Sequence, residues 1–149
     1  SQGIQVVLNM LNQRALPIIK QAGQAGMGVI ARMPLQFGLL TGKFDHASRF
    51  SGQDHRSVRL PAEFITQANN ALQPMWSMAE KYHVTKTAFS LSYILSYGEV
   101  STVIPGMRTA DQVLQNVAGL TSLSAEDRLE IEEQYQQMTT LHRALEQAG

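Results

Sequence analysis

The chain contains no cysteine, and its 149 residues carry equal numbers of acidic and basic side chains, twelve of each. The absence of cysteine excludes disulfides, thiolate metal sites and cysteine nucleophiles, and it favours a reducing compartment such as the cytoplasm. The zero net charge removes the electrostatic field that holds DNA or RNA, so we expect no nucleic-acid partner. No apolar run approaches the ~18 residues of a membrane span, so we expect no membrane association.

The N-terminal sequence and the overall composition limit the class of protein further. The chain opens Ser1-Gln2-Gly3 with no basic segment and no long apolar stretch, so no signal peptide is expected. Apolar residues make up 44% of the sequence, which is enough for a globular protein with a buried core. The length suits one domain, and we expect residues 1–149 to form it.

Short apolar stretches predict three buried strands, at residues 3–8, 27–31 and 100–104. A helical pattern that starts near Pro17 separates the first two strands. This order is typical of a βαβ unit with parallel strands, so the predicted fold class is α/β. Residues 9–15, between the first strand and the helix, form a polar segment that we expect to be a linker.

Several helix starts and breaks can be read directly. Pro61 can open a helix that Pro74 interrupts, because proline lacks the backbone N–H. Thr85 and Thr109 precede helical patterns as N-caps, and Ser124 resembles a third such start. The helix after Ser124 is expected to bury a regular apolar series, namely Ile131, Tyr135, Met138, Leu141 and Leu145.

Residues 44–60 interrupt the alternation of strands and helices. They are polar and carry several basic side chains, with few apolar anchors. Long irregular segments of this kind are usually functional lids or disordered, so we expect a mobile loop.

The first candidate site is the glycine-rich turn after the second strand. Gly38 and Gly42 would let a ligand approach the backbone, and Lys43 supplies a cation, which suits a phosphate. It is not a P-loop, because only three residues separate Gly38 from Gly42 and Phe44 replaces the magnesium-binding Ser or Thr. Taken alone, the composition favours a plain glycine-rich turn.

The second candidate site is the Pro105-Gly106 turn after the third strand. A helix follows, so its N-terminal dipole faces the turn, and Arg108 can place two hydrogen bonds on a phosphate. Alone, this pattern favours an ordinary turn with a surface arginine. Both turns, however, follow parallel strands and so lie at one edge of the sheet, where α/β folds bind ligands. Together they indicate a nucleotide.

With these turns the sequence resembles the C-terminal half of the aldo-keto reductases, (β/α)8 barrels that reduce carbonyls with NADPH. Residues 29–43 are similar to the family's seventh strand and pyrophosphate loop, and residues 91–116 to its eighth-strand segment. The resemblance implies a parallel β/α partial TIM barrel of about three strands with extra C-terminal helices. It also implies NADP as cofactor and a small carbonyl substrate for the full-length form.

The same resemblance assigns cofactor-binding roles. It implies that Arg108 binds the 2′-phosphate and that Gln112 and Asn116 lie near the adenine; Gln115 stands where glutamate is common. The full set of expected cofactor-binding residues is Pro34, Leu35, Gly38, Leu39, Gly42, Lys43, Pro105, Gly106, Met107, Arg108, Gln112, Gln115 and Asn116.

The family's catalytic Asp, Tyr, Lys and His come from its first four strands, which this chain lacks. We therefore expect no catalytic residue and weak NADP binding by the isolated chain. The four histidines have no metal-ligand spacing and cysteine is absent, so we also expect no metal ligand. Leu8-Asn9 also replaces the Tyr-Asn pair that usually ends the sixth strand.

Three interpretations stay open. The chain is the C-terminal part of a reductase, inactive alone, or a free-standing half-barrel that binds a nucleotide or a protein without catalysis, or a purely structural element. A start at Ser1 without an initiator methionine favours the first. Three strands cannot close a barrel, and their two open edges predict a homo-oligomer.

Overall fold

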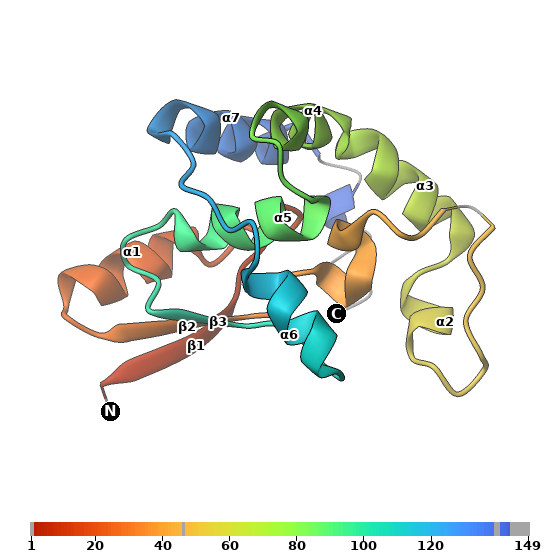
Figure 1. Cartoon of the computed structure of the whole chain (residues 1–149). Helices are drawn as coiled ribbons and strands as arrows, with labels where there is room; N and C mark the ends of the chain where they lie inside the picture. The colour runs from red at the N-terminus through yellow and green to blue at the C-terminus, as the bar shows by residue number, and fades with distance from the viewer. Residues whose placement is uncertain (1, 46, 139–140, 144–149) are drawn as a thin grey trace.

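The computed structural model contains one parallel sheet with helices packed on one of its faces (Figure 1). It describes every residue except 1, 46, 139–140 and 144–149. The strands lie in the order β1 (Gly3–Val7), β2 (Gly28–Arg32) and β3 (Thr102–Ile104). Val7 pairs with Arg32, and Arg32 pairs with Ile104, so the three strands end at one edge. The predicted parallel α/β fold is confirmed.

The helices form two layers above the sheet (Figure 1). Helices α1 (Leu16–Gln24) and α5 (Lys86–Leu95) contact β2 and β3, respectively. Above them lie α3 (Ala62–Ala71), α4 (Gln73–Lys81) and α7 (Ala125–Gln136). Three shorter segments are the 3₁₀ helix η1 (Gln36–Thr41), α2 (Arg56–Arg59) and α6 (Ala110–Val117).

The predicted helix caps are present. Thr85, Thr109 and Ser124 each accept a hydrogen bond through the side-chain oxygen from the backbone N–H three residues later, at 3.0, 3.2 and 3.1 Å. Such bonds satisfy donors that the first helical turn leaves unpaired. Pro74 also acts as expected, because α3 and α4 are separate helices joined at Leu72.

The core lies between the sheet and the helices. Val29 and Ala31 of β2 are fully buried on the covered face. The opposite face carries the paired row Gln5, Ile30 and Thr102, of which Gln5 and Thr102 are exposed. In a closed barrel that face lines the interior. Of the apolar series predicted for one last helix, Ile131 and Tyr135 are buried on α7. This helix ends at Gln136, so Met138 and Leu141, although buried, lie beyond it, and Leu145 lies outside the described residues.

The segment after β1 corrects the expectation of a polar linker at residues 9–15. Asn9 is fully buried, and Asn12 and Gln13 are 8% and 4% exposed. The backbones of Asn9 and Asn12 exchange two hydrogen bonds of 3.0 Å, and the Asn9 side chain is bonded as well. Polar residues can enter a core when their hydrogen bonds are satisfied there, and this is why composition misled the prediction.

Candidate functional site

Both predicted turns start at the carboxyl edge of the sheet. Because Arg32 and Ile104 are paired, Met33 and Pro105 begin their turns from neighbouring strands. The segments that follow, η1 and α6, each pack against α5. The expected placement of both turns at one edge is therefore correct.

The first turn is organised by its own hydrogen bonds. Gly38 and Gly42 have φ values of 95° and 71°, which disfavour any residue with a Cβ. Their N–H groups donate to the carbonyls of Leu35 and Leu39 at 3.0 and 3.3 Å. Both glycines thus have a structural reason to be there, and the exposed Lys43 is the group of this turn that remains at the surface.

Three more residues of the predicted set support this turn from inside. Pro34 is buried, Leu39 is 1% exposed, and Leu35 is half-buried against the core. Their side chains therefore fix the path of the backbone. A role for them in cofactor binding stays a prediction.

The second turn is open to solvent. Gly106, Met107, Arg108, Gln112 and Gln115 are exposed, and Pro105 is half-buried. The backbone N–H of Arg108 donates to Oε1 of Gln112 at 2.6 Å, so the residue that carries the guanidinium is fixed relative to the start of α6. Asn116 is 9% exposed and lies on the buried side of α6. Gln112 and Asn116, which the resemblance assigns to the adenine, are one helical turn apart and so share a face of α6, but only Gln112 is exposed.

Sequence reasoning missed a cavity of about 550 Å³ at the same edge of the sheet. Arg14, Arg32 and Arg59 line it. The remaining lining residues are uncharged, namely Val6, Val7, Asn12, Ala15, Met33, Gln36 and Phe37. One signal was available: Arg32 is the last residue of a strand, at the edge where α/β folds bind ligands. We call this cavity the arginine pocket.

The wall of the arginine pocket is strained. Met33, Gln36 and Phe37 have φ values of 54°, 46° and 58°, in the region that non-glycine residues rarely adopt. Asn9 holds two of them, because its Nδ2 donates to the Met33 carbonyl at 2.9 Å and to Gln36 Oε1 at 2.8 Å. Arg59 lies over the Phe37 ring, with Cζ 5.2 Å from the centroid.

The segment at residues 44–60 has contacts of its own. The Phe44 and Phe50 rings meet edge to face at 5.1 Å, and the Arg56 guanidinium lies 4.7 Å from the Phe50 centroid. Arg56 also forms an ion pair with Asp54, and its hydrogen bonds lower the pKa of that carboxyl to about 2. The Phe44 carbonyl accepts from Asn69 at 2.8 Å. That this segment moves as a loop stays a prediction.

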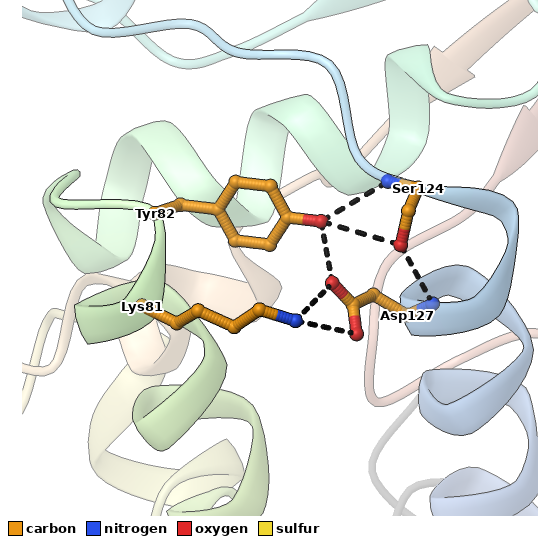
Figure 2. Close-up of polar contacts among 4 residues, drawn as sticks. All are labelled: Lys81, Tyr82, Ser124 and Asp127. Carbon is orange, nitrogen blue, oxygen red and sulfur yellow. Dashed lines mark hydrogen bonds and ion pairs between the residues drawn. The ribbon is translucent and has the colours of Figure 1, made fainter.

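A tyrosine, a lysine and an aspartate meet between α4 and α7 (Figure 2). Tyr82 donates a short hydrogen bond to Asp127, and the Lys81 ammonium lies 3.1 Å from the same carboxylate. The Tyr82 hydroxyl accepts from the backbone N–H of Ser124, the N-cap of α7. These residue types occur in the family's catalytic set, but here they lie in the outer helix layer and join two helices.

The Tyr82 hydrogen bond and the Lys81 charge lower the pKa of Asp127, although its burial acts in the opposite direction. Tyr93 and Tyr97 form a second polar cluster, which connects α5 to α7. Their hydroxyls lie 3.0 Å apart, and the Tyr97 hydroxyl donates to Glu132 at 2.7 Å. Burial raises the pKa of both phenols, so they stay protonated near neutral pH. Both clusters are explained by packing of α7.

Among the described residues, no group of three or more His, Cys, Asp and Glu side chains is arranged to hold a metal ion. In the same part of the chain, no helix is long and apolar enough to cross a membrane.

Comparison with known proteins agrees with the fold. The sequence profile of the Aldo/keto reductase family matches residues 3–136. The chain is 33% identical over 104 residues to L-glyceraldehyde 3-phosphate reductase of Escherichia coli K12, an alignment that covers 66% of the chain and 30% of that protein. Aldo-keto reductase str7 of Strobilurus tenacellus is 24% identical over 116 residues, covering 76% of the chain and 34% of that protein.

A solved structure extends the agreement. The glycerol dehydrogenase of Gluconobacter oxydans superposes with a TM-score of 0.75 at 26% identity, covering 91% of this chain and 42% of that one. The chain thus spans about a third of the length of the curated relatives that it matches. Its three parallel strands correspond to part of a barrel. The chain belongs to the aldo/keto reductase family.

Proposed function

We propose that the chain is the NADP(H)-binding C-terminal portion of a reductase that reduces small carbonyl compounds with NADPH. One observation carries the proposal: Arg108 is exposed at the carboxyl edge of the sheet, with its backbone tied to the first turn of α6. A guanidinium forms paired hydrogen bonds with a phosphate, and a helix N-terminus adds favourable potential. We place the protein in the cytoplasm, which suits a chain without cysteine.

In this proposal the chain binds and orients the adenosine side of the cofactor. NADPH supplies the hydride when it is bound, and the acid that protonates the developing alkoxide belongs to strands that this chain lacks. Two relatives are named for three-carbon compounds, L-glyceraldehyde 3-phosphate and glycerol. We extend that preference to this protein and propose a small hydroxylated aldehyde or ketone as substrate. We expect no NADPH-dependent reduction of an aldehyde by this chain alone.

The test is a titration of the chain with NADP⁺ and with NAD⁺ at low salt. NADP⁺ should bind more tightly, because it alone offers a 2′-phosphate to Arg108. One charge-assisted contact is worth ~1.5–3 kcal/mol, so Arg108→Ala should weaken NADP⁺ binding by roughly ten- to a hundredfold and leave NAD⁺ nearly unchanged. Equal curves for both nucleotides, or an Arg108→Ala curve that overlays the wild type, would contradict the assignment.

A second candidate function, protein association, is favoured by one surface. Val113, Leu114 and Val117 of α6 are 42%, 64% and 60% exposed, and Ile104 of the edge strand β3 is 49% exposed. Apolar surface beside an open strand edge favours association. We propose that a second copy of the chain covers this surface in a homo-oligomer. Light scattering at high concentration should then report a dimer or larger species, and a clean monomer would argue against it.

A further inference from the structure

A second cavity, of about 450 Å³, lies between α1 and α7. Its wall includes Gln13 before α1, Leu16 and Lys20 of α1, Glu132 and Tyr135 of α7, and His142. No described residue of the turns after β2 and β3 lines it, and it shares only Arg14 with the arginine pocket. We call this cavity the helix pocket. It lies apart from the candidate cofactor site.

The helix pocket contains a buried acceptor without a donor. Gln13 is 4% exposed, and its Nε2 donates to the carbonyls of Met10 and Ile131 at 3.3 and 3.4 Å. These two carbonyls fix the orientation of the amide, because only its NH₂ group can donate to them. The opposite atom, Oε1, is buried and has no hydrogen-bond partner in the described part of the chain. An unsatisfied buried acceptor is costly, so this atom favours a ligand that offers an N–H or O–H group.

A second group without a partner lies in the same wall. The Nε2 of His142 is buried and has no hydrogen-bond partner among the described residues. The His142 ring packs against that of Tyr135, with the centroids 4.1 Å apart, so its position is fixed. An imidazole nitrogen can donate or accept, whereas an amide oxygen can only accept. Folding thus brings two unsatisfied polar atoms, from residues 13 and 142, to one cavity.

The helix pocket also carries both signs of charge. Lys20 is exposed on α1 and Glu132 is half-buried on α7, and both line the cavity. Neither forms an ion pair with another described residue. Oε1 of Glu132 accepts from the Tyr97 hydroxyl at 2.7 Å, which fixes the carboxylate in place. A ligand that carries an ammonium and a carboxylate complements such a wall.

We propose that the helix pocket binds a free α-amino acid. The ammonium of the ligand donates to Gln13 Oε1 and lies near the Glu132 carboxylate, and its carboxylate accepts from Lys20 in a charge-assisted hydrogen bond. Leu16 is 9% exposed and Tyr135 is 6% exposed, and together they give the cavity an apolar side. We therefore expect an apolar side chain, as in leucine. The site goes beyond the proposed function and does not depend on it.

The experiment is a calorimetric titration of the chain with L-leucine at pH 7.5 and low salt. Two matched ligands each lack one charged group: isocaproate is leucine without the ammonium, and isopentylamine is leucine without the carboxylate. Each should bind about tenfold or more weakly than L-leucine, because each loses one charge-assisted contact. An equal affinity for either compound would overturn the choice of an amino acid.

Charge variants test the position of the site. Lys20→Gln should weaken L-leucine binding by about tenfold or more, and Lys20→Arg, which keeps the charge, should retain most of the affinity. Lys86→Gln is the matched control, because Lys86 is exposed on α5 outside the cavity, and it should leave the affinity unchanged. Arg108→Gln should weaken NADP⁺ binding but not L-leucine binding, so the two proposals can fail separately.

Gln13→Met tests the buried acceptor. It keeps a long side chain but removes Oε1, so L-leucine binding should weaken by about tenfold. Circular dichroism checks that this variant is folded, and the Lys20 variants and the ligand series decide the proposal if it is not. No binding of L-leucine to the wild type, or an equal loss in Lys20→Gln and Lys86→Gln, would overturn the assignment.

Discussion

The turns after β2 and β3 occupy equivalent places in the fold but are built differently. In the first, Gly38 and Gly42 donate their N–H groups within the turn, and neighbouring side chains are buried. In the second, Gly106 and Arg108 are exposed. A glycine after a strand can therefore serve two purposes. The first turn requires Gly38 and Gly42 for its backbone conformation, whereas the exposed Gly106 of the second turn leaves space for a ligand.

The largest expected difference between the two turns is in the cost of removing a side chain that supports each of them, and for the first turn that side chain is Asn9. Asn9→Ala leaves the Met33 carbonyl, Gln36 Oε1 and the N–H of Leu11 without their partner in a buried setting. The free energy of unfolding should fall by about 2–4 kcal/mol, measured by urea denaturation. In the second turn, Gln112→Ala removes the exposed acceptor of the Arg108 N–H and should cost less than about 1 kcal/mol. Equal losses would show that the turns are not built differently.

Replacing Gly38 and Gly106 by alanine also compares the two turns, with a smaller expected change in stability. A Cβ at Gly38 would lie 2.8 Å from the Phe44 ring, at a φ of 95°. Gly38→Ala should therefore lower the free energy of unfolding by about 1–3 kcal/mol. A Cβ at Gly106 meets no atom within 4 Å. Gly106→Ala should change the free energy of unfolding by less than about 0.5 kcal/mol while weakening NADP⁺ binding. A stable variant with unchanged NADP⁺ affinity would contradict a role of the second turn in cofactor binding.

The fold was more predictable from sequence than the site. Strands, N-caps and the break at Pro74 depend on neighbouring residues, so local patterns reveal them. The burial of Asn9 depends on partners at positions 33 and 36. The arginine pocket likewise unites positions 14, 32 and 59, which no local window contains. For the turns, composition showed where glycine was present but not which glycine the backbone requires.

Asp127 provides a control that touches neither turn. Its pKa is lowered in the folded chain, chiefly by the Tyr82 hydroxyl, so its stabilisation is present above the unfolded pKa of about 3.9 and is lost as pH falls through the lower folded value. Asp127→Asn should cost about 1–2 kcal/mol at pH 7, and the difference from wild type should shrink below about pH 4. NADP⁺ affinity should not change. A loss of affinity here would mean that stability, rather than the second turn, controls binding.

The most direct test of the contrast is an NMR titration of the ¹⁵N-labelled chain with NADP⁺. The account predicts that the amide signals of Gly106, Arg108 and Gln112 shift most, because these residues are exposed around the proposed phosphate contact. The signal of the exposed Lys43 should shift next, and those of the half-buried Gly38 and Gly42 should change little. Shifts confined to residues 33–43, or equal shifts in both turns, would contradict it.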